Sequence, residues 1–275
     1  MTKKRFKWSY LYLIVVFAIL YAPILFLIVY SFNSGSTMDS FQGLTLAHYK
    51  TLFADDRLIA IVLDTIIIAL LSAVIATIAG TFGALWFHQT SRPVFKNTLL
   101  SLNNILMVSP DVIIGASFLI FFTTLKVPLG FFSVLLSHAA FSIPIVVLMV
   151  LPRLKELNTS MLDAAADLGA TQRQILSDVV IPFITPGIFS GFFMALTYSL
   201  DDFAVTFFVT GNGFTTLSVE IYSRARQGIN LEINALSGLI FLITLILIVG
   251  YYFMQQASQK RLAKRRCARS EVTGL

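Results

Sequence analysis

The chain has 275 residues, of which 57% are hydrophobic and only 12% are charged. Soluble domains carry about 25% charged residues, so this composition excludes an ordinary soluble domain and indicates a membrane protein. The single cysteine, Cys267, excludes a disulfide framework and a cysteine-based metal site. The net charge of +6 arises from basic residues at the chain ends and beside apolar segments. That pattern favours contact with anionic lipid headgroups over nucleic-acid binding.

Six apolar segments are long enough to cross a bilayer, which takes about 20 helical residues. They lie near 10–32, 59–87, 97–122, 129–151, 184–209 and 233–254. The first segment is longer than the roughly 7–15 residues of a signal-peptide core, and no small-x-small cleavage site follows it. We therefore predict an all-α membrane protein of six transmembrane helices, in which residues 1–275 form one membrane domain.

The basic residues predict the orientation of these spans. With the N-terminus in the cytoplasm, 15 of the 20 Lys and Arg residues fall in cytoplasmic segments and five in outer segments. An excess of Lys and Arg on one side marks the cytoplasmic face. Both termini and the segment 152–183 are therefore predicted to be cytoplasmic.

The segment 152–183 is polar and capable of forming helices, although it lies between two apolar spans. Ser160 followed by Asp163 is typical of a helix start, and Gly169 stands where a helix end requires a left-handed residue. Thr171 can cap a second helix that runs to about residue 180. A connector between spans needs no such folded structure, so the sequence predicts a docking surface in the cytoplasm.

The same segment carries a spaced motif: acidic-Ala-Ala, three residues, Gly, nine residues, then aliphatic-x-aliphatic-Pro. Its members are Asp163, Ala164, Ala165, Gly169, Val179, Ile181 and Pro182. The motif resembles the "EAA" loop of ABC-importer permeases, with Asp, Val and Ile in place of the usual Glu, Ile and Leu. The resemblance implies the type I ABC-importer permease architecture and a loop that docks into a groove of a separate cytoplasmic ATPase dimer.

The chain has no G-x-x-x-x-G-K-[ST] sequence, so it cannot bind ATP through a P-loop. We therefore expect no enzyme activity and no cofactor in this chain, with ATP and Mg on the partner ATPase. The three histidines, at 48, 88 and 138, are scattered along the sequence and indicate no metal site.

Four aspartates lie within the apolar segments, whereas no Lys or Arg does: Asp64, Asp111, Asp201 and Asp202. A charge at the bilayer centre costs about 2.5–3.5 kcal/mol on insertion scales, so these acids need a reason. A cationic ligand, a proton pathway and contact with a second subunit all remain open. Asp64 lies close to the outer end of its span, where an interfacial role is as reasonable as a functional one.

Asp111 is the acid nearest the middle of a span, and it follows Pro110, which frees a backbone carbonyl and favours a broken helix. Asp201 and Asp202 are adjacent, and adjacent helical residues point about 100° apart. One of the two is therefore expected to face a pathway while the other caps a helix or pairs elsewhere. Tyr198 is a further candidate, because its ring can face a cation and its hydroxyl requires a partner.

The stretches 107–113, 199–203 and 208–211 resemble those of permease subunits of the spermidine/putrescine importer family. The resemblance implies a polyamine path in a bacterial cell-membrane complex that works by alternating access. Its partners would be a second permease subunit, the ATPase dimer and an extracytoplasmic polyamine-binding protein. Two alternatives stay open: an ABC permease for another solute, such as ferric iron, sulfate or molybdate, and an ion-coupled secondary transporter. An oxyanion path should offer basic residues, whereas these spans offer acids.

Overall fold

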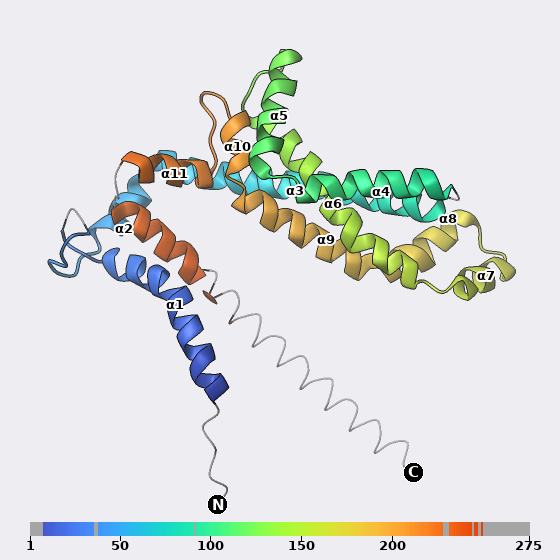
Figure 1. The fold of residues 1–275 in the computed structure, drawn as a ribbon, viewed down its shortest axis with the longest axis horizontal. Helices are drawn as coiled ribbons and strands as arrows, with labels where there is room; N and C mark the ends of the chain where they lie inside the picture. The colour runs from blue at the N-terminus through green and yellow to red at the C-terminus, as the bar shows by residue number, and fades with distance from the viewer. Residues whose placement is uncertain are drawn as a thin grey trace, which may run out of the picture. The chain divides into compact units, whose positions relative to one another are not determined.

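The computed structural model describes residues 8–35, 38–90, 92–227, 231–243, 245–246 and 249. These residues are predominantly helical and fall into two compact units (Figure 1). The larger unit is Arg57–Ser223, and the smaller combines Met1–Asp56 with Arg224–Leu275. The basic N-terminal residues 3–7, the end of the predicted sixth span and the basic tail 260–269 lie outside the described residues.

The smaller unit contains α1 (Trp8–Tyr30), α2 (Ala47–Ala54) and a helix over Leu231–Ile243, which is part of the predicted sixth span. A loop follows α1 and is held by Asn33, which is fully buried. The side chain of Asn33 accepts the backbone N–H of Gln42 at 2.8 Å and donates to the carbonyl of Ser40 at 2.9 Å. These bonds tie the two described sides of the loop together at Asn33.

The larger unit contains most of the remaining helices. They are α3 (Asp56–Gln89), α4 (Pro93–Val108), α5 (Asp111–Thr124), α6 (Phe131–Glu156), α7 (Thr159–Asp167), α8 (Gln172–Gln174), a π turn η1 (Ile175–Val180), α9 (Ile181–Asp201), α10 (Ala204–Val209) and α11 (Leu217–Gln227). Four helical stretches are apolar and long enough to span a membrane: Tyr10–Tyr30, Asp56–Gln89, Phe131–Glu156 and Gln172–Asp201. The α4–α5 pair, bent by 106°, can supply a fifth. The all-α class is confirmed, and the sixth span stays a prediction.

Two of the predicted spans are interrupted. The third breaks at Ser109–Pro110, between α4 and α5, because Pro110 has no N–H to continue the helical ladder. The fifth was predicted as one helix over 184–209, but α9 ends at Asp201 and α10 begins at Ala204. By contrast, the fourth predicted span lies in one helix, α6, which continues through Pro144 and Pro152 to Glu156.

The core of the larger unit depends on small residues that let three helices approach closely. An added Cβ at Gly80 of α3 would lie 2.6 Å from the Cβ of Val146 on α6, and one at Gly191 of α9 would lie 3.1 Å from a methyl group of the same valine. Ala73 and Ala76 of α3 are fully buried in this cluster. Small residues at helix crossings are the usual basis of close packing in membranes.

A pair of glycines on α3 tests this packing. We expect Gly80→Ala to lower the free energy of unfolding by about 1–3 kcal/mol, the usual cost of overpacking a core. Gly83→Ala is the control, because its Cβ would meet only a methyl group of Val147 at an ordinary 3.6 Å. Thermal unfolding of both purified variants in one detergent measures the difference, and equal melting temperatures would contradict the packing argument.

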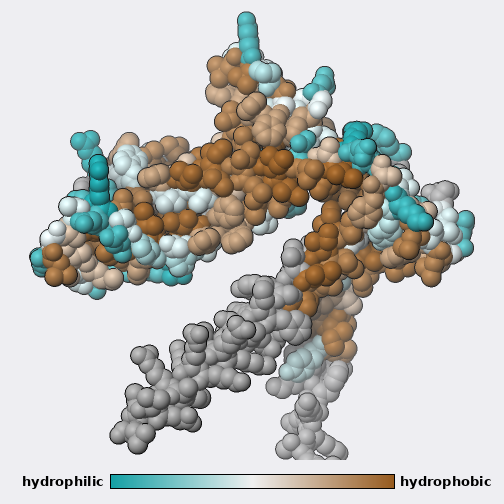
Figure 2. Space-filling model, turned by 180° about the vertical axis from the view of Figure 1, so that it is seen from behind, coloured by the Kyte–Doolittle hydropathy of each residue, from teal (hydrophilic) through white to brown (hydrophobic). Residues whose placement is uncertain are grey.

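The surface of the larger unit divides by polarity. Figure 2 shows apolar side chains over its helices and polar side chains gathered at the end that holds α7 and α8. Large apolar side chains are exposed along α3, including Ile67, Leu71 and Ile78. A face of this kind requires an apolar environment, as expected for a membrane segment.

Candidate functional site

A cavity of about 570 Å³ lies in the larger unit, beside both helix interruptions. Its walls come from α4, α5, α6, α9, α10 and the residues between α9 and α10. The lining residues are Leu106, Met107, Asp111, Ile114, Phe141, Ile145, Thr197, Tyr198, Asp201, Asp202, Phe203, Ala204 and Val205. Four of the five residues predicted for a substrate pathway therefore line one cavity.

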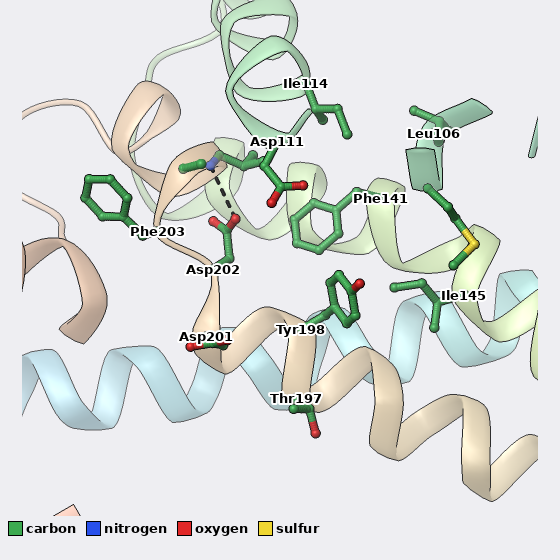
Figure 3. Close-up of a pocket in the computed structure, with 13 residues that line it drawn as sticks. Leu106, Asp111, Ile114, Phe141, Ile145, Thr197, Tyr198, Asp201, Asp202 and Phe203 are labelled. Carbon is green, nitrogen blue, oxygen red and sulfur yellow. Dashed lines mark hydrogen bonds between the residues drawn. The ribbon is translucent and has the colours of Figure 1, made fainter. Parts of the chain in front are cut away.

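The α4–α5 interruption brings Asp111 to the cavity. Ser109 ends α4 with its N–H and its hydroxyl both donating to the carbonyl of Ile105, at 2.9 and 2.7 Å. Asp111 then opens α5, where a carboxylate is favoured by the partial positive charge of a helix N-terminus. The side chain of Asp111 is exposed and points into the space bordered by Phe141 and Tyr198 (Figure 3).

The two half-helices α5 and α10 pack directly on each other. A Cβ added at Gly115 of α5 would lie 3.0 Å from the Cα of Val205 and 3.1 Å from the carbonyl oxygen of Ala204. Glycine at this position allows the backbones to meet, so the two interruptions form one structural feature. Discontinuous helices of this kind build the binding sites of many transporters.

Asp201 and Asp202 point in different directions (Figure 3). The predicted reason, their spacing within one helix, is wrong, because α9 ends at Asp201 and Asp202 is extended. Asp201 is exposed. The carboxylate of Asp202 accepts the backbone N–H groups of Val205 at 3.3 Å and Thr206 at 2.8 Å, and the Thr206 hydroxyl at 2.8 Å. Asp202 therefore caps the start of α10, with only 8% of its side chain exposed.

The fifth predicted residue, Asp64, lies on α3 and does not line this cavity. Tyr198 does line it, and 46% of the residue is exposed. Sequence reasoning missed His138, a fully buried residue of α6 whose Nε2 lies 3.3 Å from a carboxylate oxygen of Asp202. The signal that could have found it is a lone histidine inside an apolar span.

The EAA-like loop has the predicted two-helix form. The first helix is α7, although its N-cap is Asn158, whose side chain accepts the N–H of Ser160 at 3.0 Å, and not Ser160 itself. Gly169 has φ +83°, and its N–H donates to the carbonyl of Ala166 at 2.9 Å. The N–H of Ala170 donates to the carbonyl of Ala165 at 3.0 Å, which completes a Schellman cap.

The second helix of the loop begins as predicted but ends differently. Thr171 accepts the N–H of Gln174 at 3.4 Å, while the Gln174 side chain accepts the N–H of Thr171 at 2.8 Å, forming a capping box. The helix then passes through the π turn η1 directly into α9 without a break. A wider turn before Pro182 relieves the clash between its ring and the carbonyl four residues earlier.

The loop has an inner side and an outer side. Leu162, Ala165 and Ala170 pack against the core of the larger unit. Ala164 and Leu168 face outward, and Leu168, 89% exposed, is the most exposed large apolar side chain among the described residues. An exposed leucine beside small alanines is typical of a surface that a partner covers.

Comparisons of sequence identify the relatives of this chain. The spermidine/putrescine transport system permease protein PotC of Escherichia coli K12 is 35% identical over 238 residues, which are 86% of this chain and 89% of PotC. The putrescine transport system permease protein PotI of the same strain is 35% identical over 272 residues, covering 96% of this chain and 97% of PotI.

Solved structures of ABC importers share the fold. A chain of the bacterial alginate ABC transporter aligns with a TM-score of 0.69 at 16% identity, over 89% of this chain and 92% of that one. A chain of the MetNI methionine ABC transporter aligns with a TM-score of 0.55 at 17% identity, over 72% and 95%. Residues 76–264 match the family model of the binding-protein-dependent transport system inner membrane component. The chain therefore belongs to this family of transporter membrane subunits and is related within it to the polyamine permeases PotC and PotI.

Proposed function

We propose that this chain is a permease subunit of an ATP-driven importer of spermidine or putrescine and forms half of the translocation path. The observation that carries this proposal is the acidic cavity, in which Asp111, Asp201 and Asp202 stand beside Tyr198 and Phe141. Polyamines are flexible polycations, and carboxylates with aromatic faces are the groups that attract them. The likeness to PotC and PotI supports the same substrate class.

The cavity is suited to a passing cation. Its volume of about 570 Å³ exceeds what a linear polyamine fills, so the cargo can enter with part of its hydration shell. Asp111 and Asp201 are exposed and can bind ammonium groups, while apolar side chains such as Ile114 and Ile145 can contact the methylene segments. A path for sulfate or molybdate needs positive charge, whereas this cavity is lined by three aspartates.

The outer side of the α7–α8 loop is the proposed contact with a separate ATPase. Ala164 and Leu168 supply a compact apolar surface, and Gly169 makes the turn beside it. Asp163, Val179, Ile181 and Pro182 complete the motif that resembles the EAA loop. Because the loop continues into α9, movement of the ATPase would reach the residues of the cavity through one helix. ATP and Mg would be bound by that partner.

The assembly we propose has six spans per permease, with both termini and the α7–α8 loop in the cytoplasm of a bacterial cell. Its other members are a second permease, an ATPase dimer and an extracytoplasmic polyamine-binding protein. The charge distribution of the sequence supports this orientation, and the likeness to chains of ABC importers supports this class of assembly.

Uptake of labelled spermidine and putrescine tests the proposal. Cells without other polyamine importers would express this chain with its partner subunits. We expect ATP-dependent uptake that excess unlabelled polyamine blocks and excess sulfate or ferric iron does not. Uptake that followed an ion gradient without the ATPase would favour a secondary transporter, and uptake blocked by sulfate, molybdate or ferric iron would favour another ABC cargo.

A further inference from the structure

His138 is fully buried in α6, next to the cavity but not among its lining residues. Its Nδ1 lies 2.6 Å from the hydroxyl of Ser199 on α9, and its Nε2 lies 2.8 Å from the hydroxyl of Thr206 on α10. Both nitrogens of the imidazole are therefore engaged. A buried polar side chain is stable only when its hydrogen bonds are made, so this ring is held in one orientation.

The hydrogen bonds around His138 can be arranged in one direction that satisfies every group. The Thr206 hydroxyl donates its hydrogen to the carboxylate of Asp202, at 2.8 Å. Its oxygen therefore accepts a hydrogen bond from Nε2 of His138. The Ser199 hydroxyl receives the hydrogen of Ser72, at 3.0 Å, so it can donate to Nδ1. With a hydrogen on Nε2, these hydrogen bonds form a relay that starts at Ser72 on α3 and ends at the carboxylate of Asp202, which also lies 3.3 Å from the same Nε2.

These hydrogen bonds bridge the interruption between α9 and α10. Ser199 is in the last turn of α9 and Thr206 is in α10, and His138 contacts both from a third helix. Asp202 lies between them and caps α10 with the same carboxylate that receives the chain. His138 on α6 therefore holds the backbone angle between α9 and α10.

The turn between α9 and α10 determines which carboxylates are accessible to the cargo. The carboxylate oxygens of Asp202 are occupied by N–H and O–H donors, and its side chain is nearly buried, whereas Asp201 is exposed. The direction of Asp201 follows from where α9 ends, because it is the last residue of that helix.

We propose that His138 is a positioning residue for transport: it fixes the α9–α10 turn through Thr206 and Asp202, and so presents Asp201 and Tyr198 to the cargo. This inference rests on the proposed function, in which the cavity carries a polyamine. Asp202 is then a structural carboxylate, and Asp111 and Asp201 are the acids that bind the cation.

The test uses the whole importer in proteoliposomes and measures spermidine moved per ATP hydrolysed. His138→Leu removes both hydrogen bonds and is expected to lower this ratio about tenfold, the effect of losing two buried bonds to neutral hydroxyls. His138→Gln can still donate near the position of Nε2 and should restore most of the ratio. Ser137→Ala is the matched control, because the buried Ser137 hydroxyl has no hydrogen-bond partner among the described residues.

Double variants separate positioning from a general loss of structure. Asp202→Asn should add little to His138→Leu, because both break one chain, whereas Asp111→Asn should add its full effect. If His138→Leu accumulates poorly, His138→Gln with Ser199→Ala and Asp202→Asn gives the same comparison. Equal ratios in wild type and His138→Leu, equal loss in the Leu and Gln variants, or additive effects with Asp202→Asn would overturn the inference. Wild-type complexes that move no spermidine would instead refute the proposed function, and the inference with it.

Discussion

Replacing Leu168 with Asp is expected to reduce polyamine uptake to background while the protein remains inserted and folded. Leu168 is 89% exposed, so the substitution removes no contact within the chain. Burying a leucine against a partner contributes about 2 kcal/mol, and forcing a carboxylate into the same apolar groove costs more. A combined loss above about 3 kcal/mol weakens ATPase binding more than 100-fold. Uptake and co-purification of the ATPase measure both consequences.

The control for this substitution is Thr159→Asp, which adds the same charge to the same helix. Thr159 is the first residue of α7, where a carboxylate is compatible with the helix dipole, and it is exposed. We expect this variant to keep uptake and ATPase binding close to wild type. If Leu168→Asp retained normal uptake, or if Thr159→Asp failed equally, the outer side of the α7–α8 loop would not be the ATPase contact.

The combined change Asp111→Asn and Asp201→Asn is expected to lower spermidine uptake about 100-fold. Both carboxylates line the cavity and are exposed in it. After allowance for solvent, each attraction to an ammonium group contributes on the order of 1–1.5 kcal/mol. Two such losses raise the barrier to transport by about 2–3 kcal/mol, which is roughly 30- to 150-fold in rate. Initial rates at matched amounts of assembled complex measure the effect.

Asp64→Asn is the matched control for the acidic cavity, because Asp64 is an aspartate of an apolar span that does not line it. We expect its uptake to stay within about twofold of wild type, as for surface changes away from a site. Spermidine, with three amines, should also lose more than putrescine, with two. A double Asn variant that carried spermidine at the wild-type rate would contradict the cation-binding role of Asp111 and Asp201.

Local signals in the sequence were sufficient for the α7–α8 loop and for the α4–α5 break. Gly169 and Thr171 act through their own backbone neighbourhood, so their capping roles follow from residue type and spacing. Pro110 marks its break for the same reason. The different roles of Asp201 and Asp202 were predicted, but the stated reason was wrong: Asp202 lies outside α9 in an extended conformation, so helical spacing does not set its direction.

Tertiary contacts were beyond the reach of local signals. The α9–α10 break contains no proline or glycine. It coincides with the hydrogen-bonded carboxylate of Asp202, which contacts His138, 64 residues earlier in the chain. The exclusion of Asp64 from the cavity depends likewise on how the helices pack. The exposure of Leu168 could not be read from the sequence, since leucine is among the residues most often buried.

The uninterrupted path from Gln172 to Asp201 has a mechanical consequence. Thirty residues at 1.5 Å each make a rod of about 45 Å, with the loop at one end and the cavity at the other. A rocking motion of only 5° about the loop end would displace Asp201 by about 4 Å, comparable to the separation of an ion pair. Such a lever would convert a small tilt at the ATPase into the making or release of a contact with the cargo. The π turn beside Pro182 lies within this helix, so its stiffness would set how much of the tilt reaches Asp201.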